Sequence, residues 1–370
     1  MHVCHFCDTT FESEFFRNIA VGLTRRGVRV SLVELGAGTA PTWLAEANGV
    51  SYLTLGATSK LHYPMAVRRL ARFLRDENVD ILHTHLFFAG IIGLLSKRLR
   101  PKTIVALMRH HTSVVRMLGS RIHIAADKWM AEKADHVMTV SEAARTFMLE
   151  TDGIRRDDIE VVHIGFNFEK IAPNAEARTR VRSEFGFGDD DFVIGYVGNF
   201  VPRKGHLQLV LAFEEIAADL ANAKLLLIGQ GSLSDVRAAA ERVGDKKVIL
   251  AGWRDDVPAC LNAMDMFIQP SLSEAFSQVL IEAMGTRVPV IATDVGGASE
   301  VIEDGINGIL IEPDQPNAIH HGAVRLFSDN RLRRELAYAG YRTVRERFTA
   351  ARMVDKLFAL YEKWTCPKIN

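Results

Sequence analysis

Short runs of apolar, mostly β-branched residues alternate along the first half of the chain with longer segments in which apolar residues recur every three to four positions. The short runs predict buried strands, and the longer segments predict helices such as Phe15–Arg26 and Met65–Glu77. The predicted strands are His2–Cys7, Val28–Val33, Ser51–Leu55, Ile81–Thr84, Thr103–Leu107, His136–Val140 and Ile159–Val162. This alternation indicates an α/β fold with an open, mostly parallel sheet covered by helices on both faces.

The alternation stops between Phe166 and Asp191, where Pro173, polar residues and the acidic run at 189–191 occur. It resumes with the strand Phe192–Val197, and a helical pattern covers Leu326 to Trp364. The later predicted strands are Lys224–Ile228, Val248–Ala251, Met266–Gln269, Val288–Ala292 and Gly308–Ile311. We therefore predict two doubly wound, Rossmann-like domains, residues 1–168 and 191–346, joined by a linker at 169–190. Two facing sheets of this kind would hold ligands in a deep cleft at the carboxyl ends of their strands.

Length and charge agree with two domains and exclude some partners. The chain has 370 residues with 48% hydrophobic content, more than one ordinary core requires. Its 45 basic and 45 acidic residues balance, so nothing indicates a nucleic-acid partner. The start shows no signal-peptide pattern, and the longest apolar run, Leu86 to Leu95, is about half a membrane span. We expect a cytoplasmic protein.

Two local patterns have a structural and a functional interpretation. A helix carrying Arg68, Arg69, Arg72 and Arg75 also has apolar residues at helical spacing, which favours a domain helix with a solvated basic face. Peripheral contact with the inner face of a membrane is the alternative. Cys4 and Cys7 resemble half of a metal or redox site, but no second pair follows, and a buried first strand is the favoured interpretation.

A basic turn follows the strand Phe192–Val197. It has the sequence G-N-F-V-P-R-K-G, from Gly198 and Asn199 to Gly205, and places Arg203 and Lys204 just before a helix. Basic side chains beside a helix N-terminus suit a phosphate, although an exposed basic turn is also common. After the next strand, Gly229 and Gly231 either let the backbone approach a ligand or form a turn.

The stretch S-E-A-F-S-Q-V-L-I-E-A-M-G, Ser273 to Gly285, places two glutamates in an apolar segment. With Ser277 as N-cap, Glu274 precedes the helix and Glu282 lies in its second turn. The free amides of Ser277, Gln278 and Val279 would then point between the two carboxylates. This arrangement suits a diphosphate with a sugar at each end. Alternatively, Glu274 is solvated and Glu282 interacts only with the helix dipole. The later pair Gly296–Gly297 admits a similar choice between close approach to a sugar and a tight turn.

Histidines lie at the ends of two strands of the first half: His83 within one strand and His85 directly after it, then His110 and His111 after another. A metal site is the less favoured interpretation, because no carboxylate or cysteine lies at ligand spacing. Contact with a sugar or an acceptor hydroxyl is favoured for the others, and His83 is expected to be a core residue.

Four motifs, each at a strand end, resemble those of a known family. In chain order they are A-D-H-V-M-T-V-S-E (Ala134–Glu142), the Gly198–Gly205 turn, the Glu274–Glu282 stretch and V-P-V-I-A-T-D-V-G-G after Arg287. Together they resemble the retaining glycosyltransferases of family 4, group 1, which have the GT-B fold and use nucleotide-sugar donors. The resemblance covers nearly the whole chain.

The resemblance implies roles for individual residues. Arg203 and Lys204 would bind the donor diphosphate, Glu274 the transferred sugar and Glu282 the ribose. The backbone around Ala275, Phe276, Ser277, Gln278 and Val279 would assist, and Gly252, Trp253 and Arg254 would lie near the base. His110, or alternatively His111, would face the sugar at the reacting carbon, and Ser141 would lie near the cleft. The final helix, about 347–370, would return to the first domain.

The resemblance also implies a reaction: retaining transfer of a hexose or N-acetylhexosamine, from a UDP-sugar more readily than from GDP-mannose, without metal or cofactor. The acidic run 189–191 is expected to be a solvated turn. One loop departs from the family, because Thr10 and Phe11 replace its glycine pair beside Glu12. With His85, these residues are the acceptor-side candidates, and the acceptor, a glycan, lipid or small molecule, stays open. A nucleotide-sugar epimerase and a catalytically silent partner subunit are the alternatives.

Overall fold

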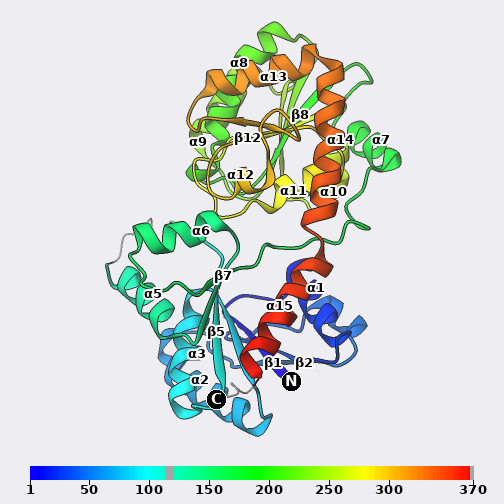
Figure 1. Cartoon of the computed structure of the whole chain (residues 1–370). Helices are drawn as coiled ribbons and strands as arrows, with labels where there is room; N and C mark the ends of the chain where they lie inside the picture. The colour runs from blue at the N-terminus through cyan, green and yellow to red at the C-terminus, as the bar shows by residue number, and fades with distance from the viewer. Residues whose placement is uncertain (113–120, 367–370) are drawn as a thin grey trace. The chain divides into compact units, whose positions relative to one another are not determined.

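The computed structural model describes residues 1–112 and 121–366, and the chain forms two compact α/β units (Figure 1). The first unit contains Met1–Phe166 and the segment from Thr349 onward, and the second contains Asn167–Phe348. The chain therefore leaves the first unit once and returns to it once, as the predicted final helix requires.

The first unit is built on a seven-stranded parallel sheet with the strand order β3-β2-β1-β4-β5-β6-β7. Its strands are β1 (His2–Cys7), β2 (Arg29–Glu34), β3 (Val50–Thr54), β4 (Ile81–His85), β5 (Ile104–Arg109), β6 (His136–Thr139) and β7 (Ile159–Val161). Its described α-helices are α1 (Glu14–Thr24), α2 (Tyr63–Asp76), α3 (Phe87–Leu99), α5 (Arg121–Lys133), α6 (Glu142–Thr146) and α15 (Ala350–Thr365). All seven predicted strands are confirmed, with ends shifted by at most two residues.

The two faces of this sheet differ in chemistry. Because side chains alternate along a strand, Cys4, Phe6 and Leu82 join a large apolar core on one face. In the parallel register of β1 and β4, His5 pairs with His83 and Cys7 with His85, which places these side chains on the other face. There α15 packs beside α1 (Figure 1). Its residue Tyr361 bonds to His83. Three histidines thus lie under the helix that returns from the second unit.

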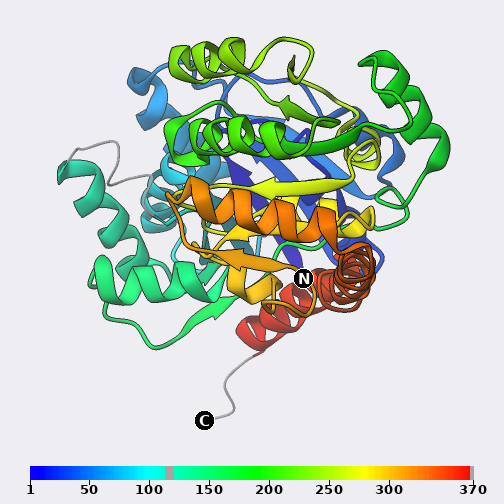
Figure 2. The same cartoon turned by 90° about the horizontal axis from the view of Figure 1, so that it is seen from above.

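The second unit has a six-stranded parallel sheet with the order β10-β9-β8-β11-β12-β13. Its strands are β8 (Phe192–Val197), β9 (Ala223–Ile228), β10 (Val248–Gly252), β11 (Met266–Gln269), β12 (Val290–Thr293) and β13 (Ile309–Ile311). Its helices are α7 (Ala175–Glu184), α8 (His206–Asp219), α9 (Ser234–Val243), α10 (Val257–Asn262), α11 (Gln278–Gly285), α12 (Ala298–Val301), α13 (Pro316–Ser328) and α14 (Asn330–Arg347). Helices α8 and α13 pack side by side on the sheet (Figures 1 and 2). The six predicted strands are confirmed here as well.

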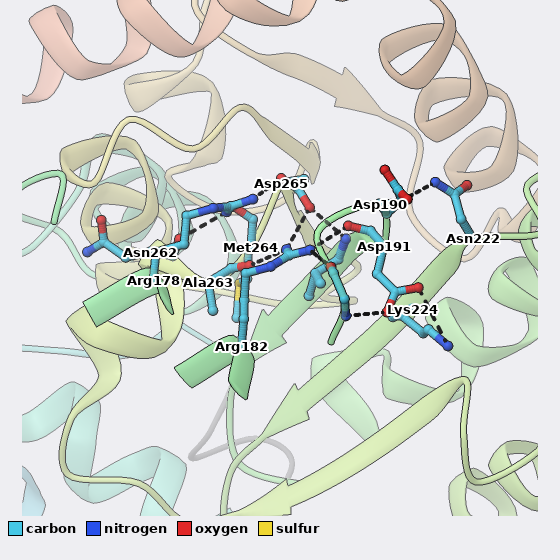
Figure 3. A network of polar contacts seen from close by, with 12 residues as sticks. Arg178, Arg182, Asp190, Asp191, Asn222, Lys224, Asn262, Ala263, Met264 and Asp265 are labelled. Carbon is cyan, nitrogen blue, oxygen red and sulfur yellow. Dashed lines mark hydrogen bonds and ion pairs between the residues drawn. The ribbon is translucent and has the colours of Figure 1, made fainter. Parts of the chain in front are cut away.

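The segment predicted as a linker contains α7 and lies inside the second unit. Arg178 and Arg182 of α7 both form ion pairs with Asp265, which precedes β11 (Figure 3). The acidic run beside it is only partly a solvated turn. Asp191 accepts a hydrogen bond from the Gly188 amide and lies 3.7 Å from the ammonium group of Lys224. The acidic run therefore anchors the start of β8.

The closing helical pattern is divided between the units. α14 ends at Arg347, and α15 begins after Thr349, whose hydroxyl caps the amide of Arg352. Within the described residues, no helix is long and apolar enough to cross a membrane.

Candidate functional site

The basic turn after β8 is packed against the loop that follows β11. Gly205 has φ +68°, and a Cβ atom there would lie 1.9 Å from the carbonyl oxygen of Pro270. Only glycine therefore allows this approach. The amide of Leu272 donates to the Arg203 carbonyl over 2.7 Å, which joins the two loops through their backbones. The fold thus brings the two predicted donor-binding segments together.

Lys204 and Glu274 form the centre of this site. The Glu274 carboxylate is hydrogen-bonded to the Lys204 ammonium group and accepts another bond from Ser271 Oγ over 2.9 Å. Glu274 is 8% exposed, so it is not the solvated carboxylate of the alternative interpretation. A charged pair in this position can serve two ligand groups at once, because the ammonium group can turn to a phosphate while the carboxylate accepts from sugar hydroxyls.

The glycine pair after β12 supports the Glu274 loop. Gly296 has φ +57°, and a Cβ atom there would lie 2.0 Å from the carbonyl oxygen of Glu274. The Gly297 amide donates to the carbonyl of Ala275 over 3.1 Å. Close backbone packing against this loop is therefore what requires glycine at position 296.

Helix α11 begins after Ser277, as predicted, but the Ser277 side chain does not cap it. Its hydroxyl donates to the side-chain oxygen of Gln269 instead. The first-turn amides of a helix have no partner within the helix, so those of the exposed Gln278 and the partly buried Val279 can receive an anion. Phe276 is buried, and its ring lies 5.7 Å from that of Phe348.

Glu282 lies in the second turn of α11 and is partly buried. Burial raises the pKa of its carboxyl group from 4.5 to about 7. The protonated form is therefore favoured in the folded protein below about pH 7. The stabilisation that this proton gives is complete below pH 4.5 and is lost as the pH rises through about 7.

We expect Glu282→Gln to raise the free energy of unfolding at pH 8 by about 1–3 kcal/mol, because it removes a carboxylate that burial disfavours. At pH 4 the two proteins should have equal stability. Denaturation with urea at both pH values measures this difference, and Glu241→Gln, on an exposed position of α9, is the matched control. An equal gain at both pH values would contradict the assignment.

A cavity of about 90 Å³ lies at the carboxyl ends of β8, β9 and β10. Its lining residues are Phe200, Gly229, Gly231, Ser232, Leu233, Val236, Arg237, Leu250 and Gly252. Three predicted glycines are therefore among them. Arg254 is not, because its guanidinium group is ion-paired with Glu184 and Asp256 and holds the pKa of the Asp256 carboxyl down to about 2. A role for Arg254 near the base stays a prediction.

His206 is a residue of the site that the sequence analysis did not select. It is the first residue of α8, and its Nε2 donates to the Gly198 carbonyl over 3.2 Å. Its ring stacks on Phe200 at 4.3 Å. Its position directly after the last glycine of the basic turn is the feature of the sequence that could have identified it. Its side chain spans the turn beside Asn199 and fixes the turn's shape.

In the first unit, His110 and His111 follow β5, and Arg109 holds His111 in place. The Arg109 guanidinium group is buried, donates to the carbonyl of His111 over 3.1 Å, and forms ion pairs with Asp127 (3.2 Å) and Asp152 (2.7 Å). Burial, followed by the charge of Arg109, lowers the pKa of His111. His110 is hydrogen-bonded to His85 instead of to this cluster.

The acceptor-side candidates have structural contacts of their own. The Phe11 ring is fully buried against Phe16 and packs in the core. It is therefore not exposed to an acceptor, in contrast to the prediction. The Glu12 carboxylate accepts from the amide of Thr42, and Thr10 Oγ1 accepts from the Glu12 amide. Ser141 is buried as the N-cap of α6, where it accepts from the amide of Ala144. Thr10, Glu12 and Ser141 thus each have a structural contact within the first unit.

Known proteins share this pair of sheets. The chain aligns with a solved glycosyltransferase of Rickettsia africae (TM-score 0.84, 20% identity, 98% of both chains). It also aligns with Anabaena HepE in complex with UDP and glucose (TM-score 0.85, 19% identity, 98% of this chain and 100% of that one). The fold is therefore that of the GT-B glycosyltransferases, as predicted.

Sequence comparison gives the family. The model described as Glycosyltransferase Family 4 matches residues 13–170, and that described as Glycosyl transferases group 1 matches 177–343. The N-acetyl-alpha-D-glucosaminyl L-malate synthase of Bacillus anthracis is 27% identical over 319 residues, which cover 84% of this chain and 82% of that protein. The chain belongs to the family 4, group 1 glycosyltransferases.

Proposed function

We propose that this glycosyltransferase moves a hexose or N-acetylhexosamine from a nucleoside-diphosphate sugar to an acceptor hydroxyl, with retention of configuration. The bonded pair Lys204–Glu274 beside the first turn of α11 is the observation that supports this most, because it combines a cation for diphosphate with a carboxylate for sugar hydroxyls. UDP-sugars are preferred to GDP-mannose. A solved neighbour contains UDP, and a relative 24% identical over 301 residues is an Escherichia coli galactosyltransferase named for UDP-Gal.

The difficult step is the departure of the nucleoside diphosphate from an oxocarbenium-like sugar. Arg203, Lys204 and the amides that open α11 would stabilise the charge on the leaving phosphate, which is the role that a metal has in other transferases. We therefore propose a reaction without metal. The acceptor hydroxyl would attack on the face that the diphosphate leaves, with His110 beside the sugar. Relatives named for polysaccharide synthesis, such as Staphylococcus aureus CapM, suggest glycan assembly as the setting.

A peripheral membrane contact would depend on charge. The apolar side of α2 is packed in the core of the first unit through Leu70 and Leu74, while Arg68 and Arg72 are exposed. An anionic membrane could therefore attract the basic side of α2, but the helix could not insert its apolar side without leaving the core.

A thermal-shift screen tests the donor site. We expect one of UDP-glucose, UDP-N-acetylglucosamine, UDP-galactose and GDP-mannose to stabilise the wild type by about 2.7 kcal/mol at a hundred times its dissociation constant. Glu282→Ala should abolish this gain, because the ribose loses its carboxylate, whereas Glu241→Ala should keep it. No gain with any donor from folded protein would favour the silent partner subunit. Conversion of the donor sugar without an acceptor would favour the epimerase.

A further inference from the structure

Three histidine rings form a hydrogen-bonded row on the face of the first sheet that α15 covers. His5 Nδ1 lies 3.0 Å from His85 Nε2, and His85 Nδ1 lies 3.0 Å from His110 Nε2. The row starts inside β1, passes the end of β4 and reaches the residue after β5. His5 and His85 are fully buried, and His110 is partly exposed. The row therefore leads from the interior of the sheet to the residue proposed to contact the sugar.

The rings in this row are neutral, because burial disfavours the imidazolium form. Burial lowers the pKa of His5 to about 3 and that of His110 to about 4, and it lowers that of His85 well below the ordinary value. A neutral imidazole has one N–H donor and one lone pair. Each ring must therefore donate at one nitrogen and accept at the other, so the tautomer of one ring fixes the tautomers of all three.

Two directions of donation satisfy this rule. In the first, His5 Nδ1 donates to His85 and His85 Nδ1 donates to His110, which leaves a lone pair on His5 Nε2 and a proton on His110 Nδ1. In the second, every bond is reversed and His5 Nε2 carries a proton. His5 Nε2 is buried and has no hydrogen-bond partner among the described residues, so the second direction would leave an unpaired N–H there.

The neighbouring His83 favours the first direction. Its Nδ1 is bonded to the Tyr361 hydroxyl, and a phenol donates most simply to an imidazole lone pair, so His83 carries its proton on Nε2. His83 Nε2 is also buried without a described partner, and the rings of His5 and His83 are 4.9 Å apart. A lone pair on His5 beside this N–H is favourable, whereas a second unpaired N–H would add repulsion.

We propose that His85 and His5 are positioning residues that hold the His110 ring in the Nδ1–H tautomer. None of the described residues is hydrogen-bonded to His110 Nδ1, so within this part of the chain the nitrogen can meet a ligand as a hydrogen-bond donor. Its Nε2 lone pair is used by His85, so the neutral ring cannot act as a general base. The ligand atom is then an acceptor oxygen, and its identity as a sugar oxygen rests on the proposed function.

A buried metal ion is the competing use of this cluster, because His5, His83 and His85 each offer a ligand atom within 4.8 Å of the others. Both ring nitrogens of His85 already take part in 3.0 Å hydrogen bonds, so an ion bound there would break the row. The hydrogen-bonded row requires no rearrangement of these nitrogens and is therefore favoured over a metal site.

The tautomer can be measured directly. With ¹⁵N-labelled histidine and a His110→Gln variant for assignment, long-range ¹H–¹⁵N spectra of the full chain should show the His110 proton on Nδ1, the less populated tautomer of a free imidazole. His85→Asn should preserve this state, because its side-chain N–H can replace Nδ1–H, whereas His85→Ala should shift His110 to the Nε2–H form. The turnover of His85→Ala should fall about tenfold, the loss expected for one hydrogen bond to the ligand, and His85→Asn should restore it.

His83→Phe is the matched control, since His83 is equally buried and touches the same rings but lies outside the row. It should leave the His110 tautomer unchanged. A wild-type His110 proton on Nε2, or a stoichiometric metal ion in purified protein, would overturn the proposal. The spectra need no substrate, so the two proposals can fail separately. If His110 has the Nδ1–H tautomer but no donor binds, the proposed function is contradicted and the positioning role is not.

Discussion

Lys204→Ala is expected to lower the rate of nucleotide release from the bound donor by about 10²–10³-fold, the cost of removing one group that stabilises a developing negative charge. The Lys204 ammonium group is held by Glu274 beside α11. The diphosphate gains charge as it departs, so the contribution of Lys204 is larger in the transition state than in the bound donor. The loss should therefore appear mainly in kcat, and only weakly in KM.

A second effect of the substitution must be separated from the first. Removing Lys204 leaves the Glu274 carboxylate, 8% exposed, without its cation, which should cost about 1–3 kcal/mol of stability. Lys204→Ala combined with Glu274→Gln removes that cost and should still lack turnover. Lys224→Ala, another partly buried lysine of the same unit with an acidic partner, is the control for charge. Unchanged kcat with a raised KM would assign Lys204 to donor binding only.

The strands could be predicted from the sequence because buried parallel strands are short β-branched runs. The start of β12 was placed two residues early, at Val288, because the apolar run includes Pro289, which has no amide for the ladder. Helix α7 was missed because it has few apolar residues, so its sequence shows no helical period of hydrophobic positions. Polar contacts of Arg178 and Arg182 hold it in place instead.

The donor side of the site could be predicted further than the acceptor side. Lys204 and Glu274 follow β8 and β11, which are neighbours in a parallel sheet, so the strand-end rule brings them together. The role of His5 could not be predicted. A single histidine inside an apolar strand resembles a core residue until the register of β1 against β4 is known. Phe11 was misplaced because the sequence does not show that its ring turns inward to Phe16.

Arg182→Ala is expected to lower the free energy of unfolding of the second unit by about 3–5 kcal/mol, because several acceptors lose a charged donor at about 1–3 kcal/mol each. The Arg182 side chain is 8% exposed. Its guanidinium group lies 3.2 Å from the Asp265 carboxylate and donates to the carbonyls of Gly188 (2.6 Å), Asp191 (2.7 Å) and Ala263 (3.2 Å) (Figure 3). Alanine would leave the carbonyls of Asp191 and Ala263 without this donor and weaken the attachment of α7 to the sheet, while Asp265 would keep its ion pair with Arg178.

Hydrogen exchange of the full chain can locate this effect. Peptides covering β8 and β11 should exchange faster in Arg182→Ala, because Asp265 also accepts from the amide of Val193 at the edge between these strands. Peptides of the first unit should be unchanged. Arg180→Ala is the matched control, since Arg180 lies on the same helix with a side chain 56% exposed and an ion pair to Asp256, and it should cost less than about 0.5 kcal/mol. Equal effects of the two substitutions would mean that α7 is held by its general packing and not by the guanidinium group of Arg182.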